Sequence, residues 1–208
     1  MSWLLKNKRR NIRVVQKKQF LNYCLRILYF FFIGAAFCIC SCATTTVKDD
    51  RPFIWITDNS KFILLPPQNI ERPLDEYQLM SASFAGQNYY MISWVKADDA
   101  GIDIVLLNEM GANLGELIWR DGNISFSSTV LPSSLPPEYI IADFQLCFYN
   151  SAALAQALKK SGLSLVETET ARHIYMKKDL IIEIIKNQKS ITLSNHLRGY
   201  TYTMEGGL

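Results

Sequence analysis

The fold is decided by residues 88–126, NYYMISWVKADDAGIDIVLLNEMGANLGELIWRDGNISF. Segments rich in aromatic and β-branched residues alternate here with short turns, which is typical of β-strands joined as hairpins. The expected strands are residues 88–96, 101–108, 113–120 and 123–130. The Asp121-Gly122 pair supplies the positive φ of a tight hairpin turn. Strands joined this closely run antiparallel, because a parallel return needs about a dozen connecting residues.

Side chains alternate between the two faces of a strand, so charged residues identify the outward face. Asp103 and Glu116 mark that face in two strands. The opposite, apolar face is then formed by Ile102, Ile104, Leu106, Leu117 and Trp119. In residues 88–96 the alternation fails, because both faces are apolar. We therefore expect this strand to be covered on both sides, by a core on one face and by helices, a ligand or a partner on the other.

The pattern of strands continues on either side of this region and is interrupted once by helices. Ser151 is the expected N-cap of the second helix, and Gly162 is expected just beyond its end. The helices are expected at residues 138–149 and 151–160, and the further strands at residues 78–85, 163–167, 171–177, 179–186, 190–193 and 199–204. The predicted class is α+β, with one curved antiparallel sheet and helices inserted between its halves.

Charge is distributed unevenly along the 208 residues. The chain has 22 Lys plus Arg and 19 Asp plus Glu, and the first 42 residues hold eight of the basic residues and no acidic one. The rest of the chain is therefore mildly acidic. Because binding to phosphates needs basic residues clustered on the folded domain, the composition disfavours a nucleic-acid partner.

Residues 1–42 are expected to be a lipoprotein signal peptide. A basic stretch precedes residues 27–41, ILYFFFIGAAFCICS, an uncharged run of 15 residues. A membrane-spanning helix needs about 20 apolar residues, whereas the apolar region of a signal peptide has about 7 to 15. Residues 39–42, ICSC, resemble the lipobox of bacterial lipoproteins, with Cys42 as the lipidated residue. An uncleaved signal anchor is the alternative.

Residues 43–52, ATTTVKDDRP, are polar and aperiodic, which is typical of a tether, and residues 53–208 are the expected folded domain. Acyl chains such as palmitate on Cys42 each contribute about 0.8 kcal/mol per buried CH₂, so several chains make anchoring stable. By resemblance to lipoproteins of bacteria with two membranes, Ala43 after the cysteine implies the periplasmic face of the outer membrane.

The remaining residues show little sign of a catalytic or metal site. His173 and His196 lack a second ligand at the spacing of a metal site, so we expect no metal and no cofactor. Cys147 lies in an apolar run, where a buried, inert thiol is expected. The sequence contains no Gly-rich phosphate loop and no GxSxG motif. We therefore expect a protein that is not an enzyme.

Two resemblances add to this interpretation. Residues 88–126 resemble the sheet of the LolA/LolB-like superfamily, the periplasmic carrier and outer-membrane receptor of bacterial lipoproteins. LPPEYIIADFQLCFYNSAALAQALKKSG and SITLSNHLRGYTYTM look like an uncharacterised lipoprotein family of that superfamily, found near genes for aryl-polyene or polyketide-type lipids. Its recurring residues stand here as Leu135, Pro136, Pro137, Tyr139, Ala142, Asp143, Gln145, Leu146, Leu193, Asn195, Gly199 and Tyr200.

The resemblance implies an open half-barrel whose helices close an apolar cavity. The expected lipid-cavity residues are Trp94, Ile102, Ile104, Leu106, Leu117 and Trp119. By its position in the loop between two strands, Met110 is the expected membrane-contact residue. The implied partners are the membrane, a lipid or lipoprotein ligand, and a periplasmic carrier protein.

The first functional hypothesis is an outer-membrane-anchored periplasmic lipoprotein that binds or hands over a lipid or acylated substrate in this cavity. The second is a non-catalytic envelope scaffold whose core is filled. The third is an enzyme acting on a lipid-linked substrate, for which the sequence offers no site.

Overall fold

The computed structural model describes residues 51–84, 86–131 and 135–206. The predicted signal peptide, Cys42 and most of the predicted tether lie outside these residues. The described part begins immediately before a short hairpin and contains the predicted sheet and both predicted helices.

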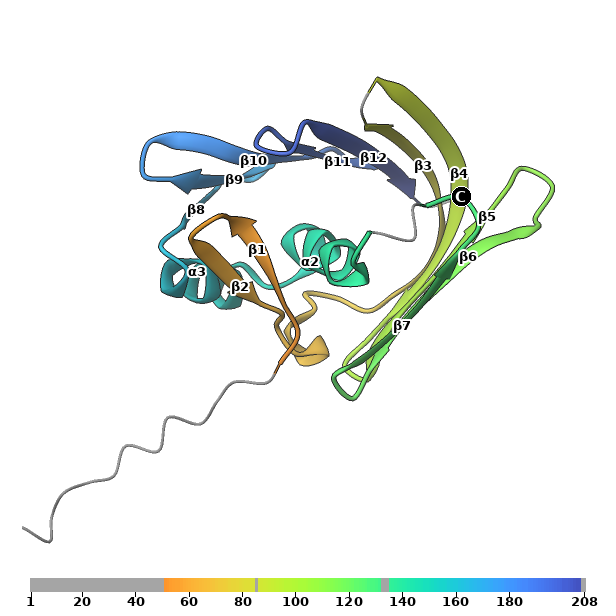
Figure 1. Ribbon diagram of the computed structural model, residues 1–208, viewed down its shortest axis with the longest axis horizontal. Coiled ribbons are helices and arrows are strands. Elements are labelled where there is room, and N and C mark those ends of the chain that lie inside the picture. The colour runs from red at the N-terminus through yellow and green to blue at the C-terminus, as the bar shows by residue number, and fades with distance from the viewer. Residues whose placement is uncertain (1–50, 85, 132–134, 207–208) are drawn as a thin grey trace, which may run out of the picture. The chain divides into compact units, whose positions relative to one another are not determined.

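One antiparallel sheet of ten strands forms the framework. Its strands are β3 (Leu74–Phe84), β4 (Gln87–Ala97), β5 (Gly101–Leu107), β6 (Asn113–Arg120), β7 (Asn123–Ser128), β8 (Ser164–Glu167), β9 (Ala171–Met176), β10 (Asp179–Lys186), β11 (Ser190–Asn195) and β12 (Tyr200–Gly206). The spatial order is β7-β6-β5-β4-β3-β12-β11-β10-β9-β8, so the sheet is open, with β7 and β8 at its edges. Figure 1 shows the strong curvature of the sheet. The predicted α+β class and its single curved antiparallel sheet are confirmed.

The sheet consists of two meanders that meet at its centre. Strands β3 to β7 follow one another along the chain and in space, and so do β8 to β12. The meanders are joined by the antiparallel pair β3–β12, in which Ala82 lies opposite Tyr202. The predicted tight turn between β6 and β7 is confirmed, since Asp121 and Gly122 have φ of 51° and 76°. Positive φ at both central residues matches the right-handed twist of the two strands.

Two helices stand between the meanders in the chain: α2 (Pro137–Phe148) and α3 (Ser151–Lys160). The predicted C-terminal end of α3 is confirmed, because Gly162 follows it with a φ of 76°. Its predicted N-cap was wrong by one residue. The side chain of Asn150, not of Ser151, accepts hydrogen bonds from the N–H groups of Ala152 (2.9 Å) and Ala153 (3.3 Å). Asn and Ser are about equally good N-caps, so the residue types alone do not distinguish the two positions.

A hairpin that the sequence analysis did not predict precedes the sheet. Strands β1 (Phe53–Thr57) and β2 (Ser60–Ile63) pair with each other and form a separate two-stranded sheet. Figure 1 shows this hairpin and α2 on the concave side of the large sheet. Ile54 and Phe62 pair across the hairpin and are buried toward that side.

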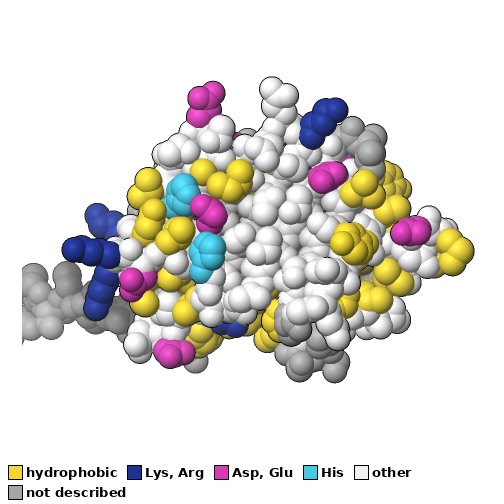
Figure 2. Space-filling model, turned by 90° about the horizontal axis from the view of Figure 1, so that it is seen from above, with side chains coloured by type: hydrophobic (Ala, Val, Ile, Leu, Met, Phe, Trp, Pro, Cys, Tyr) yellow, Lys and Arg dark blue, Asp and Glu magenta, His cyan; other side chains and the backbone are white. Residues whose placement is uncertain are grey.

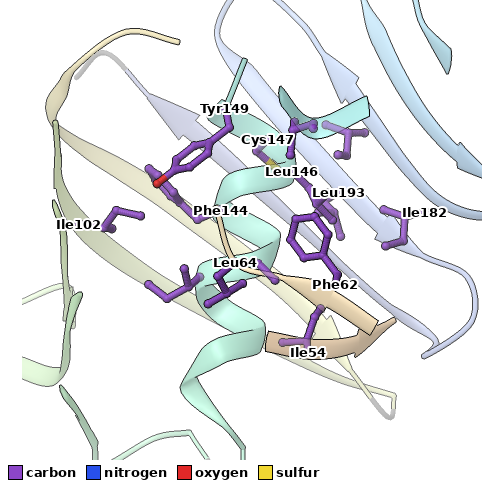
Figure 3. Packing of buried hydrophobic residues seen from close by; sticks show 14 of the residues in the cluster. Ile54, Phe62, Leu64, Ile102, Phe144, Leu146, Cys147, Tyr149, Ile182 and Leu193 are labelled. Carbon is purple, nitrogen blue, oxygen red and sulfur yellow. The ribbon is translucent and has the colours of Figure 1, made fainter. Parts of the chain in front are cut away.

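The core fills the space between the sheet and these covering elements. Phe144 and Leu146 of α2 lie between Ile102 of β5 and Leu193 of β11, as Figure 3 shows. The hairpin and the segment after it contribute Phe62 and Leu64 from below. A curved sheet with one buried face requires such a cover, since its apolar face is otherwise exposed to water.

Candidate functional site

Five of the six predicted lipid-cavity residues share the concave face of the sheet. The register pairs Ile102 with Trp119 and Ile104 with Leu117, so these side chains are direct neighbours. All of them are buried, together with Leu106. The prediction of their shared apolar face is confirmed. In the described structure they contact other core residues rather than solvent.

Trp94 lies on the opposite, convex face and does not belong with the other five. It pairs with Tyr77 and Val105, whereas its neighbours in sequence, Ser93 and Val95, are buried on the concave side. The Trp94 indole Nε1 donates a hydrogen bond to Oδ1 of Asp75 (3.0 Å). Both faces of β4 are apolar, so the alternation that assigned the other residues could not assign Trp94.

The convex face of β4 is not covered by any element in the described part of the chain. Tyr90 is 73% exposed, and Tyr77 and Leu79 on β3 are exposed beside it. In Figure 2, hydrophobic side chains are visible at the end of the molecule that carries β3, β4 and β5, and also at the opposite end. Helices are therefore not the cover of this face among the described residues, and cover by a ligand or a partner stays a prediction. The double apolar character of β4 instead corresponds to a core on one face and an apolar surface on the other.

The concave face is less completely covered near the junction of β3, β4 and β12. Ala82 of β3 pairs with both Tyr89 and Tyr202, so these three side chains are neighbours on one face. Tyr89, Tyr202 and Met80 are half-buried, and Phe84 is 51% exposed. We call this group, Met80, Ala82, Phe84, Tyr89 and Tyr202, the central concave region.

Sequence reasoning did not single out the central concave region. Its residues alternate correctly within their strands, but its position depends on the pairing of β3 with β12. These strands lie more than a hundred residues apart in the chain, and no local pattern indicates that they pair. The region offers apolar and aromatic surface that is in part accessible to water.

A buried polar cluster joins α2 to the β11–β12 hairpin. The Tyr200 hydroxyl donates to Oδ2 of Asp143 (2.6 Å) and accepts from Nδ2 of Asn195 (3.2 Å). Nη2 of Arg198 donates to the Tyr139 hydroxyl (3.0 Å), and its guanidinium lies 4.3 Å from the Tyr139 ring centroid. The two segments quoted for the second resemblance are thus brought together by hydrogen bonds.

Burial controls the protonation of this cluster. Removal from water raises the pKa of the Asp143 carboxyl from 3.8 to about 7, although the Tyr200 hydrogen bond and the Arg198 charge lower it. Burial also raises the pKa of Cys147, one turn further along α2, to about 12. The predicted buried thiol is therefore confirmed, and it stays protonated at neutral pH. A protonated, buried thiol is a poor nucleophile.

Two polar contacts fix the C-terminal half of α2. Arg172, which is buried on the concave face of β9, donates from Nη1 to the carbonyl oxygens of Leu146 (2.9 Å) and Cys147 (3.2 Å). A cation here satisfies carbonyls that the end of a helix leaves without partners. The amide of Gln145 both accepts from Leu65 N (2.9 Å) and donates to Leu65 O (2.7 Å). These contacts hold α2 between the sheet and the segment after the β1–β2 hairpin.

Three polar atoms in the buried interior have no hydrogen-bond partner among the described residues. They are Nε1 of Trp119, Oε1 of Gln78 and the hydroxyl of Tyr149, all in side chains that are almost completely buried. An unpaired polar atom in an apolar interior is unfavourable by about 1 to 3 kcal/mol. Water or a polar group of a ligand would satisfy each of them.

Met110 lies at the tip of the loop between β5 and β6 and is 90% exposed. Oδ1 of Asn108 accepts from the N–H groups of Met110 (3.0 Å) and Ala112 (2.8 Å), which closes the loop into a tight turn. Gly111 adopts a φ of 78° at this turn. An ordered turn thus presents an apolar side chain directly to its surroundings.

The titratable residues of the described ranges form no metal site. Groups of three or more His, Cys, Asp or Glu side chains suited to a metal are absent from these ranges. His173 is half-buried, and its Nε2 lies 3.1 Å from Oε1 of Glu183 on the neighbouring strand. Within the same ranges, neither α2 nor α3 combines the length and hydrophobicity that a membrane crossing requires.

The fold and this site define an α+β protein with an open, curved antiparallel sheet and an apolar concave face. The family described as "Protein of unknown function (DUF3261)" matches residues 75–206, from β3 to the end of β12, and the chain belongs to this family. The β1–β2 hairpin precedes the matched residues. No curated protein matches the chain.

Proposed function

We propose that the protein is a lipid-anchored lipoprotein of the outer membrane, facing the periplasm, that binds or hands over a lipid or an acylated substrate. The concave side of its half-barrel sheet takes up the acyl chain, and no covalent catalysis is involved. The observation that carries this proposal is the central concave region, an apolar part of the concave face that the covering elements leave half open.

An acyl chain gains from this surface through the removal of apolar area from water. The gain is about 25 cal/mol for each Å² removed, so an acyl chain that loses about 200 Å² gains about 5 kcal/mol. The surrounding Tyr89 and Tyr202 offer aromatic faces together with hydroxyl groups. An apolar surface with few polar groups is typical of sites that bind lipidic ligands.

Uptake begins at the central concave region, because polar contacts fix α2 over the rest of the concave face. Arg172 and Gln145 fix α2, and the polar cluster around Asp143 fixes its other half. An acyl chain that enters beside Phe84 therefore meets Met80 and Tyr89 first. In this proposal, the similarity to the LolA/LolB-like superfamily extends to function, and a periplasmic carrier protein supplies the ligand.

A second candidate function is favoured by the burial of the predicted cavity residues. Ile102, Leu117 and Trp119 are at most 3% exposed, which is what a filled core requires. An envelope scaffold with a filled core would use its surface, and the exposed Tyr77, Leu79 and Tyr90 provide an apolar one. This candidate predicts no bound lipid.

The substitution Ala82→Trp separates the two candidates. A large ring at this position occupies the central concave region between Tyr89 and Tyr202. A ligand that loses about 60 Å² of apolar contact loses about 1.5 kcal/mol, which is about tenfold in affinity. Ser83→Trp is the matched control, because Ser83 is the next residue of β3 and faces the convex side.

Binding is measured with a fluorescent fatty acid on the chain lacking residues 1–42, and bound lipid is identified by mass spectrometry of the purified protein. We expect stoichiometric lipid in the wild type, weaker binding in Ala82→Trp and unchanged binding in Ser83→Trp. Absence of both lipid and probe binding in the wild type would support the scaffold. Turnover of a lipid substrate would instead indicate an enzyme.

A further inference from the structure

The outer face of the β1–β2 hairpin is an aromatic surface that does not belong to the core. Phe53 pairs with Ile63 and Trp55 with Lys61, so these four side chains share the face opposite the buried Ile54 and Phe62. Trp55 is 46% exposed and Phe53 is exposed beside it, with their ring centroids 6.1 Å apart. Nζ of Lys61 lies 3.7 Å from the centroid of the Phe53 ring.

The turn between β11 and β12 meets the hairpin at the backbone of Trp55. Nη2 of Arg198 donates to the Trp55 carbonyl oxygen (2.7 Å), and the preceding residue, Leu197, is exposed. The Tyr139 hydroxyl donates to the same carbonyl oxygen (3.3 Å). Lys61 is therefore held over the exposed ring of Phe53, and Arg198 is held at the backbone of Trp55, next in sequence to the exposed Leu197. We call Phe53, Trp55, Lys61, Ile63, Leu197 and Arg198 the hairpin face.

We propose that the hairpin face rests on the bilayer in which the protein is anchored. This inference rests on the proposed lipid anchor at Cys42. Trp and Phe with neighbouring Lys and Arg are the residues that favour the boundary between headgroups and acyl chains, where rings meet apolar chains and cations meet phosphates. Exposed to water, the same rings leave apolar surface unburied.

The position of the hairpin in the chain supports this occupant. Phe53 is the first residue of β1, and ten residues separate Cys42 from it. Ten extended residues span at most about 35 Å, so a lipidated Cys42 keeps the hairpin face close to the bilayer. The hairpin part of this face precedes the residues that the family matches, whereas Leu197 and Arg198 lie within them.

The hairpin face and the Met110 loop are separate surfaces. Figure 1 shows the β5–β6 hairpin at the far end of the domain from β1 and β2. If the hairpin face holds the domain on its own membrane, Met110 is presented at a distance from this contact. The two contacts therefore have to be tested with different variants.

Fluorescence quenching by brominated lipids tests the proposal on the lipidated protein that begins at Cys42 and therefore lacks Trp3. The protein is reconstituted in vesicles of phosphatidylethanolamine and phosphatidylglycerol that contain brominated phosphatidylcholine, and flotation with the vesicles verifies its attachment. We expect quenching of the wild-type tryptophan emission and loss of most of it in Trp55→Phe. Trp94→Phe is the matched control, because Trp94 is half-buried on the convex face of β4 and should not contribute to the quenching.

The outcomes distinguish this inference from the proposed anchor. Flotation together with equal quenching in the wild type and Trp55→Phe would overturn the hairpin-face contact and leave the anchor intact. Failure of the wild-type chain to float would overturn both. A change in oligomeric state in Trp55→Glu, with unchanged quenching by the vesicles in Trp55→Phe, would assign the face to a second copy of the chain and overturn the bilayer contact.

Discussion

Single residues decide how α2 is held against the sheet. Asp143 is a carboxylic acid placed where water does not reach it, with Tyr200 and Arg198 as the groups that favour its charge. Arg172 is a buried cation with a full set of acceptors around it. The sequence alone predicted the burial of Cys147, but not the partnership of Asp143 with Tyr200, because that contact spans 57 residues of the chain.

The stability of the protein should depend on pH through Asp143. Its pKa is raised from 3.8 to about 7, so the folded state binds the proton more tightly than the unfolded chain. The contribution of Asp143 to the free energy of unfolding is then largest below about pH 4, falls by at most about 1.4 kcal/mol per pH unit between pH 4 and pH 7, and levels off above. Urea unfolding of Asp143→Asn across this range should lack the decline.

The control for this measurement is Asp121→Asn in the exposed β6–β7 turn. Asn tolerates the positive φ of that position, so the backbone is kept while one carboxylate is removed. We expect this variant to follow the wild-type dependence on pH. Equal curves for Asp143→Asn and the wild type would contradict the shifted pKa.

At the scale of elements, local patterns in the sequence predicted both helices and all ten strands of the large sheet. Alternation and turn residues specify these elements without help from distant contacts. The β1–β2 hairpin was missed although FIWIT and KFI alternate around Asp58-Asn59, a pair typical of turns. The faces of β4 could not be predicted, since apolar residues occupy both of them.

The loop between β5 and β6 is predicted to contact the membrane. The resemblance assigns this contact to Met110, and the structure leaves that side chain 90% exposed in a turn closed by Asn108. In Met110→Glu we expect unchanged folding, since no core contact is lost, and slower transfer of a fluorescent lipid to vesicles. Met110→Leu should retain the wild-type rate. A wild-type transfer rate in Met110→Glu would contradict the predicted membrane contact of Met110.

The arrangement of the whole molecule could be predicted only in part. The order of elements indicated one antiparallel sheet with inserted helices, whereas the predicted signal peptide of residues 1–42 lies outside the described residues and stays a prediction. The junction of the two meanders at β3 and β12 could not be predicted, because pairing between distant strands leaves no local pattern. The central concave region depends on that junction and was therefore missed together with it.

Attachment of the whole molecule to the membrane is predicted to require Cys42. Cells are labelled with a palmitate analogue, and the protein is then isolated from separated inner and outer membranes. We expect label on the wild type in the outer-membrane fraction and none on Cys42→Ser. Label that persists in Cys42→Ser, or a wild type without label, would contradict the lipid anchor. Cys40→Ser is the control that should keep the label.

The pairing of β3 with β12 also has a consequence for biosynthesis. Of the described strands, β12 is the last to be translated, yet it occupies an interior position between β3 and β11. A growing chain can form each meander separately, but it cannot join them until residues 200–206 have emerged. If the chain is exported as proposed, the complete sheet therefore forms only after residues 200–206 have passed through the translocation channel.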